Sequence, residues 1–486
     1  MSTNSGPQDR SFRKARGQFF TPSEVSRSLL SCAAADLLQL GLEPLQTGPL
    51  LDPSCGDGSF LAAALAESWV KGSSELCGID IDDEVLGGPV GSQLVHGDGL
   101  QVEVPGDGSF AAAVGNPPYG GRGLKELGDA QLQRIGTRLE CWRLDSEGRP
   151  RPLGSSGWNR LRRFPIASLF AERFVRSVRA GGLIAVLLPE SLLCNRRDSP
   201  LRAWLLRHCR LVSVTELPAN TFAATGTRAR THFVVLRRRT RPLEAIHSLP
   251  QAEEVLLRQM GSDRPVQRLA AAKLQQRGRW DPDFHQPHWD RHLASCRLEL
   301  KPLDGFVDSL SYGAIRVGER PELSAQGGSF YVTQKAVKDW GVDLQRCQTI
   351  ASQAPFDTPR YRLEPGDLVV PRCGRGTLGR NRLTRFDGAP LPAVVDCFTD
   401  RLRLVGISTA WVLGVLRSPL GWDQIRRTFN GVGTPNLSFA EIRSLMVPIP
   451  SGSQAQQAES MWLQVANRKL PLDALRGFVH SACGLD

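Results

Sequence analysis

The 486-residue sequence predicts an α/β fold, with a doubly wound sheet over residues 1–245 and a mixed α+β domain over residues 246–486. Two observations predict the sheet. From about residue 48, short apolar runs alternate with longer amphipathic stretches, which is the pattern of strands joined by crossover helices. The run LIAVLLP at residues 183–189 has no polar alternation, which is typical of a strand buried on both faces.

The expected elements of the first domain follow one another regularly. A helix (SFLAAALAESWV) comes after the first strand and its Gly-rich turn, and another over residues 168–182 is expected to end at Gly181 and Gly182. Residues 120–165 interrupt the pattern, because they are rich in Gly and Arg and hold no convincing strand. An insertion of this length is usually functional or disordered. The expected strands are residues 49–52, 76–81, 93–98, 111–115, 183–189, 211–217 and 231–239.

Beyond residue 245 the sequence changes to short strand-like runs, turn residues and a few helices. We expect strands at residues 316–319, 329–333, 366–372 and 401–406, and helical stretches at 410–427 and 454–470.

Net charge and cysteine usage restrict the classes of function. The formal charge of +11, with a pI near 9.4, favours a polyanionic partner such as nucleic acid. The longest apolar run is too short to span a bilayer, so we expect no membrane partner. The polar, basic N-terminus lacks the apolar segment of a secretory signal. The eleven cysteines form no CxxC pair, which indicates reduced thiols in a cytoplasmic protein and no disulfide framework.

A Gly-rich turn follows the first expected strand, in the segment DPSCGDGSF that runs from Asp52 to Phe60. Glycines such as Gly56 and Gly58 let the backbone approach a ligand in the crevice where open α/β sheets bind cofactors. The segment is not the GxGxxG of dinucleotide sites, and the Asp52 carboxylate suits a cationic group better than a pyrophosphate. A plain strand–turn–helix junction would also explain the glycines.

Two further acids, Asp80 and Asp98, end the next two expected strands. Asp80 stands where an acid accepts hydrogen bonds from a ribose, and Asp98 could accept one from the amine of a cofactor's adenine. Alone, each acid is more often a helix N-cap or a turn residue. Together with Asp52 they place three acids along one sheet edge, which favours a cofactor site.

The tetrapeptide Asn116-Pro117-Pro118-Tyr119 follows the fourth expected strand and is the strongest signal. Consecutive prolines cannot extend the ladder, and they would point the Pro117 carbonyl into the site. This carbonyl and the Asn116 side-chain oxygen then face one amine. An adenine amine is a poor nucleophile, and two fixed acceptors favour the tetrahedral nitrogen that forms as a methyl group arrives. Tyr119 offers a ring for stacking a base rotated out of the duplex.

With DPxCGDGSF and the segment QFFTP at residues 18–22, the NPPY tetrapeptide resembles the gamma class of amino-methylating DNA methyltransferases. The resemblance covers about residues 14–240 and implies a Rossmann-like catalytic domain that uses S-adenosylmethionine. The implied cofactor contacts are Thr21 and Pro22 with the methionine part, Asp52 with its amino group, Asp80 with the ribose, Asp98 and Phe170 with the adenine, and Ser54, Gly56 and Gly58 in the loop.

The same resemblance implies that Asn116, Pro117, Pro118 and Tyr119 hold the target adenine. Phe222 matches the position of a second stacking ring, although a core phenylalanine at a strand–loop junction would fit there nearly as well. Asn at the first motif position implies methylation of adenine N6 and not cytosine N4. Cytosine C5 chemistry would need a Pro-Cys nucleophile in this loop, and the loop has none. Gly99 departs from the family, whose members often carry a bulky residue there.

Two stretches of the second domain resemble the target-recognition domains of type I restriction specificity subunits, namely residues 363–379 (LEPGDLVVPRCGRGTLG) and 429–438 (FNGVGTPNLS). The resemblance covers about residues 310–450 and implies contacts with base edges and phosphates of DNA. A literal GxGxxG at residues 374–379 is not interpreted as a nucleotide site, since no good helix follows it. Three histidines in FHQPHWDRH (284–292) are interpreted as part of a polar linker and not as metal ligands.

These patterns predict a site-specific DNA methyltransferase that transfers a methyl group to adenine N6 after base flipping, in or derived from a restriction-modification system. The expected partner is double-stranded DNA, bound by a monomer, with a cognate restriction endonuclease as a candidate partner. Two alternatives stay open. One is an RNA or protein-glutamine methyltransferase, because NPPY serves planar amines and amides generally. The other is an inactive DNA-binding specificity module.

Overall fold

The computed structural model describes residues 19–104, 108–120, 123–152, 157–223, 230–324, 327–352, 355–429 and 435–485. The chain forms two compact units, Met1–Asp283 and Phe284–Asp486. Across these described ranges, no helix combines the length and the apolar character needed to cross a membrane.

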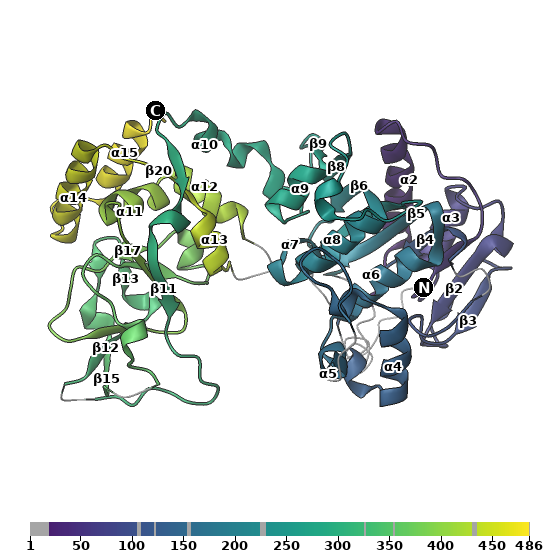
Figure 1. The fold of residues 1–486 in the computed structure, drawn as a ribbon, viewed down its shortest axis with the longest axis horizontal. Coiled ribbons are helices and arrows are strands. Elements are labelled where there is room, and N and C mark those ends of the chain that lie inside the picture. The colour runs from purple at the N-terminus through teal and green to yellow at the C-terminus, as the bar shows by residue number, and fades with distance from the viewer. Residues whose placement is uncertain are drawn as a thin grey trace. The chain divides into compact units, whose positions relative to one another are not determined.

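The first unit is built on a nine-stranded sheet with the order β3-β2-β1-β4-β5-β7-β6-β8-β9 (Figure 1). Strands β1 to β5 are parallel, whereas β7 pairs antiparallel with both β5 and β6. The strands are β1 (Leu50–Asp52), β2 (Leu76–Asp80), β3 (Gln93–His96), β4 (Phe110–Gly115), β5 (Val178–Pro189), β6 (Cys209–Glu216), β7 (Thr231–Arg238), β8 (Glu254–Gln259) and β9 (Gln267–Ala270).

Helices cover both faces of this sheet, as the apolar β5 sequence predicts. Leu183 belongs to a hydrophobic core shared with α2 (Ser23–Gln39) and α3 (Ser59–Ala66). Its neighbour Ile184 belongs to a second core, shared with α6 (Ile166–Ser177) and α8 (Ser199–His208). The alternation continues along β5, so the prediction of a doubly wound α/β fold is confirmed.

The boundary between the units lies further along the chain than the expected position near residue 245. Strand β8 pairs in parallel with β6, and β9 pairs with β8, so both extend the sheet of the first unit. Val255, Leu256 and Leu257 are fully buried in it. The helix α9 (Ala271–Arg277) follows, and the unit ends at Asp283. The change in sequence pattern beyond residue 245 suggested a boundary, but the residues after β7 only connect two strands of one sheet.

The end of α6 also differs from the expectation. The helix stops at Ser177, and β5 begins at Val178 and continues through both Gly181 and Gly182. The pairing of β4 with β5 is irregular at this point. A Cβ on Gly182 would lie 2.7 Å from the Ala111 carbonyl oxygen, so glycine here permits close strand contact and does not end a helix.

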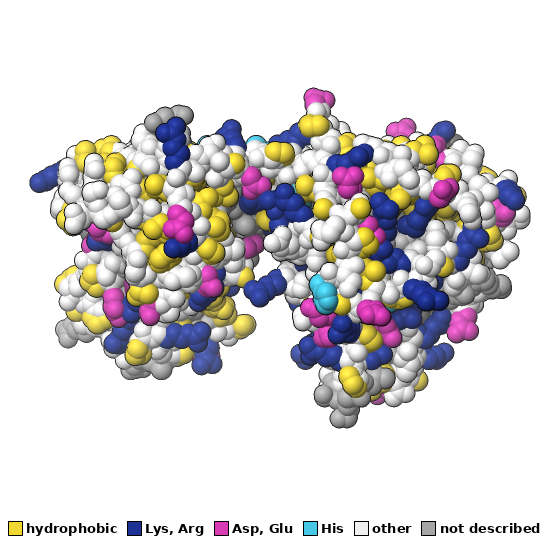
Figure 2. Space-filling view, turned by 45° about the horizontal axis from the view of Figure 1, so that its top comes forward, with side chains coloured by type: hydrophobic (Ala, Val, Ile, Leu, Met, Phe, Trp, Pro, Cys, Tyr) yellow, Lys and Arg dark blue, Asp and Glu magenta, His cyan; other side chains and the backbone are white. Residues whose placement is uncertain are grey.

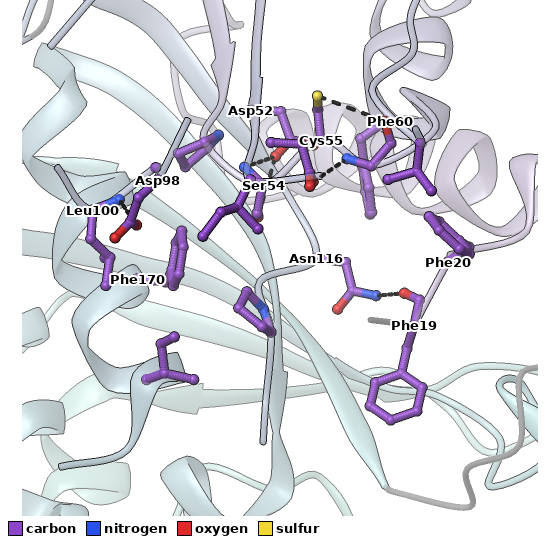
Figure 3. Close-up of a pocket in the computed structure, with 18 of the residues that line it drawn as sticks. Phe19, Phe20, Asp52, Ser54, Cys55, Phe60, Asp98, Leu100, Asn116 and Phe170 are labelled. Carbon is purple, nitrogen blue, oxygen red and sulfur yellow. Dashed lines mark hydrogen bonds between the residues drawn. The ribbon is translucent and has the colours of Figure 1, made fainter. Parts of the chain in front are cut away.

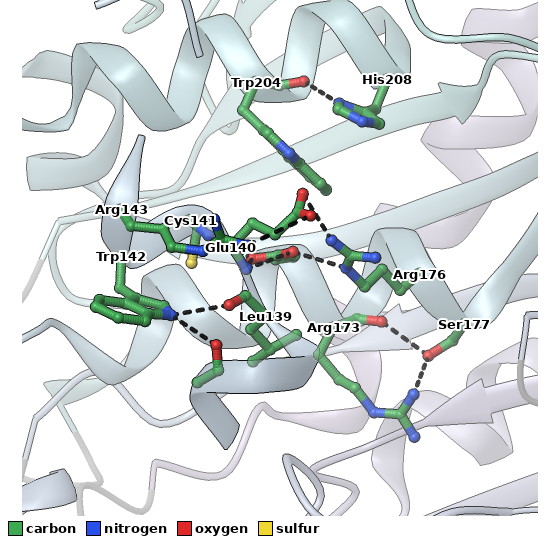
Figure 4. A network of polar contacts seen from close by, with 12 residues as sticks. Leu139, Glu140, Cys141, Trp142, Arg143, Arg173, Arg176, Ser177, Trp204 and His208 are labelled. Carbon is green, nitrogen blue, oxygen red and sulfur yellow. Dashed lines mark hydrogen bonds and ion pairs between the residues drawn. The ribbon is translucent and has the colours of Figure 1, made fainter. Parts of the chain in front are cut away.

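The described part of the insertion at residues 120–165 contains α4 (Asp129–Arg138), α5 (Gly157–Arg162) and short 3-10 turns, with a turn closed by an isolated bridge between Leu144 and Pro150. Glu172 of α6 anchors the insertion. Glu140, Cys141 and Arg176 belong to the same network of polar contacts (Figure 4). The fully buried Glu172 carboxylate accepts hydrogen bonds from the backbone N–H of Glu140 at 2.8 Å and of Cys141 at 2.7 Å. Arg176 donates to it through Nε at 2.6 Å. The buried charge is therefore both paired and hydrogen-bonded.

We expect Glu172→Ala to lower the free energy of unfolding by about 3–5 kcal/mol, because it leaves buried donors and a cation without their acceptor. Urea unfolding of the two proteins measures the difference. Glu103→Ala is the matched control, since Glu103 is 80% exposed and lies 3.5 Å from Arg138. It should change stability by about 1 kcal/mol or less. Equal effects of the two substitutions would contradict the anchoring role of Glu172.

The second unit is a mixed α+β domain, as predicted. One antiparallel sheet has the order β11-β19-β16-β17, and a smaller sheet has the order β15-β12-β18. The larger sheet contains β11 (Val307–Tyr312), β16 (Leu368–Pro371), β17 (Thr384–Arg385) and β19 (Thr399–Leu404), and the smaller contains β12 (Ser329–Val332), β15 (Gln348–Ile350) and β18 (Ala393–Val395). Two short pairs join β10 (Leu300–Pro302) with β20 (Met446–Pro448) and β13 (Val337–Lys338) with β14 (Gly341–Val342).

Helices pack beside the larger sheet around a core that includes Trp411 and Trp462. The helices are α10 (Arg291–Ser295), α11 (Thr409–Arg417), α12 (Pro419–Arg427), α13 (Phe439–Ser444), α14 (Gly452–Ala466) and α15 (Leu472–Ala482). The stretch expected to be helical from 410 to 427 is two helices, because Pro419 starts a new one after Ser418. Residues 316–319, expected to form a strand, instead form a turn, with Gly318 at φ +82°.

Candidate active site

A cavity of about 620 Å³ lies where β1, β2 and β4 end (Figure 3). This is the sheet edge at which open α/β folds bind ligands. Most of the predicted cofactor residues and half of the NPPY motif line it together. The predicted residues in the lining are Thr21, Asp52, Ser54, Gly56, Asp80, Asp98, Asn116, Pro118 and Phe170. Pro22, Gly58, Pro117, Tyr119 and Phe222 are absent from the lining.

Two carboxylates predicted from the sequence, Asp52 and Asp80, hold the loop after β1 through hydrogen bonds. Asp52 is 1% exposed, and its Oδ1 accepts a hydrogen bond from the Ser54 backbone N–H at 3.0 Å. Asp80 Oδ2 accepts one from the Gly56 N–H at 2.8 Å. Gly58 has φ +77° and packs against Gly87, so it shapes the loop without lining the cavity. The acids and the loop therefore form one structural unit.

Asp98 lies in the cavity lining but also has local partners. Its Oδ1 accepts from the Leu100 backbone N–H at 2.9 Å, and its Oδ2 accepts from Gln101 Nε2 at 2.5 Å. This is the turn geometry that the sequence left open as an alternative. Because Phe170 lines the same cavity, an apolar ring and a carboxylate are both available to an adenine there.

The departure at Gly99 has a steric reason. A Cβ at this position would lie 1.9 Å from the carbonyl oxygen of Pro53 and 3.2 Å from Phe170 Cε1. No side chain fits there without moving the loop that carries Asp52. Glycine at position 99 is therefore required by the close packing of the cavity wall in this chain.

Asn116 is fixed by the N-terminal segment. Its Nδ2 donates to the Phe19 carbonyl oxygen at 2.8 Å and to Thr21 Oγ1 at 3.0 Å. Both bonds use the amide nitrogen, so they orient the side-chain oxygen. That oxygen accepts a hydrogen bond from the Tyr119 hydroxyl at 2.5 Å. Asn116 thus presents one oriented acceptor at the cavity.

Burial changes the proton affinity of several groups here. It raises the pKa of Asp52 well above the usual range, and it also raises the pKa of Asp80, against the backbone N–H groups that bond to these acids. Burial also raises the pKa of Tyr119, so its hydroxyl stays a donor at neutral pH. Burial raises the thiol pKa of Cys55 for the same reason, so this thiol stays protonated at neutral pH and is a poor nucleophile.

The two predicted stacking rings have different surroundings. Tyr119 is partly buried and packs against the cores on both faces of the sheet. Phe222 is 2% exposed and belongs to the core shared with α2 and α3. The structure therefore places Phe222 in the position of a core phenylalanine, the other interpretation that the sequence allowed.

Sequence reasoning missed several residues of this site. Phe19 contributes a backbone carbonyl, for which a sequence carries no signal. Glu126 and Leu127 lie in the insertion, and Ile166 lies at the start of α6, yet all three line the cavity. Gly115 packs against the Asp52 carboxylate, since a Cβ there would lie 2.4 Å from Oδ1. Its place directly before the NPPY motif was the available hint.

The two stretches of the second unit that resemble target-recognition domains meet in space. Cys373 and Asn436 form an isolated bridge, and the Leu437 N–H donates to the Arg372 carbonyl oxygen at 3.1 Å. The Arg372 guanidinium lies 3.8 Å from the centre of the Tyr312 ring. The literal GxGxxG ends in a 3-10 turn (Leu378–Arg380), and the next element is β17 and not a helix, as expected for a segment that is not a nucleotide site.

The histidine segment 284–292 is part of the folded second unit and is not the polar linker that we expected. His285 and Trp289 are buried, and His292 Nδ1 lies 2.8 Å from Asp423 Oδ2. The described ranges contain no group of three or more His, Cys, Asp or Glu side chains placed to hold a metal ion. The many polar residues of this segment suggested a linker, but His285 and Trp289 pack into the unit.

Two curated proteins have sequences similar to parts of this chain. Over 197 residues, covering 40% of each protein, the chain is 29% identical to a type II methyltransferase of Thermus thermophilus. In sequence, the chain is similar to a restriction-modification methyltransferase. It is also 23% identical over 241 residues to the defense against restriction protein B of Escherichia phage P1, covering 49% of this chain and 9% of that protein. No family model matches.

The matched segments span less than half the length of either curated relative. Among solved structures, the type IIL restriction-modification enzyme MmeI, determined in complex with DNA, aligns with a TM-score of 0.53 at 12% identity. The alignment covers 98% of this chain and 73% of MmeI. At this level of identity the likeness concerns the fold, and it extends over both units.

Proposed function

We propose that the chain is a DNA methyltransferase of a restriction-modification system that transfers a methyl group from S-adenosylmethionine to adenine N6. One observation carries the proposal: the Asn116 amide, oriented by Phe19 and Thr21, stands at the same cavity as Asp52 and Asp80. A cofactor site and an acceptor for an amine are thus adjacent. The similarity to a type II methyltransferase supports the same activity.

The residues of this chain fit S-adenosylmethionine. Asp52 and Asp80 are buried carboxylates, suited to the cofactor's amino and ribose hydroxyl groups, and Phe170 with Asp98 suits its adenine. Thr21 and Pro22 would flank the methionine part, although Pro22 itself does not line the cavity. When bound, the cofactor supplies an electrophilic methyl group on a sulfonium.

The chain's own residues then hold the target amine. Asn116 Oδ1 accepts a hydrogen bond from one N–H of the amine and stabilises the nitrogen as it becomes tetrahedral. The resemblance gives the second N–H to the Pro117 carbonyl, although Pro117 itself does not line the cavity. Tyr119 now donates to that Oδ1, so the arriving amine takes over the acceptor from the Tyr119 hydroxyl. Pro118 lines the cavity and the Tyr119 ring packs beside it against the two cores, and together they provide the surface proposed for the extruded base.

Two features support DNA as the substrate, namely the sequence of the second unit and the positive net charge of the chain. The two meeting stretches of the second unit resemble target-recognition domains, and the net charge is +11. Lys and Arg side chains are spread over the visible face of each unit, with Asp and Glu between them (Figure 2). A monomer acting on double-stranded DNA, with a cognate endonuclease as a candidate partner, is the corresponding assembly.

Incubation of the full chain with labelled S-adenosylmethionine and unmethylated genomic DNA tests this function. We expect label in DNA, mapped to N6-methyladenine by single-molecule sequencing, with a rate that falls steeply with salt. Label in RNA or protein but not in DNA would replace the proposal with the amine-methyltransferase alternative. Tight DNA binding without any label would replace it with the inactive specificity module.

Cofactor affinity should rise with pH. Burial raises the pKa of Asp52 and Asp80, so both stay protonated to higher pH than a carboxyl in water. The cationic amino group of the cofactor favours the Asp52 carboxylate, so affinity weakens as pH falls through the raised pKa. Calorimetric titration over a pH series measures this, and Asp52→Asn should flatten the profile. A profile that is flat in the unchanged protein would contradict the role of Asp52.

A further inference from the structure

A second cavity of about 410 Å³ lies in the first unit, outside the methyl-transfer site. The turn before α6 forms one wall with Phe164 and Pro165, and the chain leading into α8 forms another with Arg197 and Asp198. The next residue after Pro165, Ile166, lines the candidate active site. A single turn of the chain therefore separates the two cavities.

The second cavity is cationic. Arg160, Arg163 and Arg197 all line it. Arg160 and Arg163 are exposed, and within the described part of the chain neither guanidinium has a hydrogen-bond or ion-pair partner. Arg197 is 73% exposed and lies 3.6 Å from Asp198. Free guanidinium groups at one cavity attract anions, and their fork matches phosphate oxygens.

A buried acceptor faces the same space. Asp198 is 5% exposed and lines the cavity, and its Oδ2 has no hydrogen-bond partner among the described residues. Burial raises the pKa of this carboxyl, against the charges of Arg197 and Arg202. A buried oxygen without a partner is unfavourable, and a ligand N–H would satisfy it. The cavity therefore offers both a phosphate site and an acceptor for a donor group.

The remaining walls are apolar and firmly held. Leu144, Leu201 and Phe164 provide flat or aliphatic surface for a ring. Cys141 lies in the wall as well, and its backbone N–H is bound by the buried Glu172 carboxylate (Figure 4). This wall is thus part of the Glu172 anchor and does not depend on a ligand for its position.

We propose that this cavity binds one nucleotide, with its phosphate on Arg160 and Arg163, its base against the apolar walls and a base N–H on Asp198. A nucleotide has an anionic phosphate, a flat base and N–H donors on that base. These three parts match the arginines, the apolar walls and the Asp198 carboxylate, which lie at different places in the cavity. Its source is either the DNA strand next to the extruded adenine or a free mononucleotide. The first source rests on the proposed function and agrees with the single turn between the cavities.

Binding of deoxyguanosine monophosphate to the full chain, measured by calorimetry with S-adenosylhomocysteine present, tests the site. The nucleotide should bind, and deoxyguanosine without the phosphate should bind more weakly. Arg160→Ala with Arg163→Ala should weaken nucleotide binding at least about tenfold, since charge-assisted hydrogen bonds are lost. Both side chains are exposed, so the variant should fold. Arg241→Ala is the control, because Arg241 is exposed and follows β7 at the opposite edge of the sheet.

Asp198→Asn tests the base contact separately. It should weaken the binding of deoxyguanosine monophosphate and leave the affinity for inorganic phosphate unchanged. A second measurement identifies the source of the nucleotide. If it is the DNA strand, the double arginine variant should reduce the salt dependence of duplex binding by about one phosphate contact, and Arg241→Ala should not. An unchanged salt dependence with lost nucleotide binding identifies a free mononucleotide.

Two results would overturn the proposal: no binding of the mononucleotide to the unchanged chain, or equal binding to the double arginine variant. Neither depends on methyl transfer. A chain that binds the nucleotide at these arginines but never labels DNA would overturn the proposed function and keep this site.

Discussion

Asn116→Ala is expected to lower the rate of methyl transfer by about 10²–10³-fold while S-adenosylmethionine still binds, because it removes an acceptor that acts mainly in the transition state. The side chain is held at the cavity by two bonds to its nitrogen, so only its oxygen is available to the substrate. Single-turnover transfer to DNA, with cofactor affinity measured in parallel by calorimetry, separates the two effects.

Thr21→Val is the matched control for the orientation of Asn116. It keeps the volume of a buried side chain but removes one of the two acceptors, and the Phe19 carbonyl remains. We expect a loss of about tenfold or less, since one hydrogen bond contributes about 1 kcal/mol. An Asn116→Ala protein with full transfer activity would remove the amine-acceptor role from this residue.

Gly99→Ala is expected to weaken S-adenosylmethionine binding at least about tenfold and to lower the free energy of unfolding by about 1–3 kcal/mol. The added Cβ would lie 1.9 Å from the Pro53 carbonyl oxygen, so the loop must shift. Pro53 directly follows Asp52, and the shift therefore displaces the carboxylate proposed to bind the cofactor.

Gly72→Ala provides the comparison, because no heavy atom lies within 4 Å of a Cβ at that position and its backbone is extended. It should leave both cofactor affinity and stability nearly unchanged. Calorimetric titration and urea unfolding of the two variants measure the difference. If Gly99→Ala bound the cofactor as well as Gly72→Ala did, the loop around Pro53 would not be the cofactor site.

Much of the fold could be predicted because it depends on local patterns. The uninterrupted apolar run of β5 has two buried faces, and the alternation of strands and helices produces a covered sheet. The wrong predictions concern segments whose local sequence pattern suggests one structure while strand pairing in the folded chain imposes another. The glycines at 181 and 182 look like a helix stop, yet they lie inside β5 because two strands approach closely there. The same holds for β8 and β9, whose pairing extends the first unit beyond residue 245.

The candidate site shows a similar division. Asp52, Asp80 and Asn116 could be selected from sequence, since each follows a strand and parallel strands end at one edge. The partners of Asn116 could not, because a backbone carbonyl 97 residues away leaves no mark in the residue pattern. The position of Phe222 was undecided in sequence, and packing alone placed it in a core.

The sequence by itself determined the doubly wound α/β class, the order of the cofactor loop and the NPPY motif, and the basic charge, since these depend on neighbours along the chain or on composition. Only the tertiary structure decided which atoms orient Asn116, why residue 99 must be small, and that Arg160, Arg163 and Asp198 share a cavity. The physical reason is that hydrogen bonds and steric contacts join segments far apart in sequence, and their geometry exists only once the sheet and its covering helices have formed.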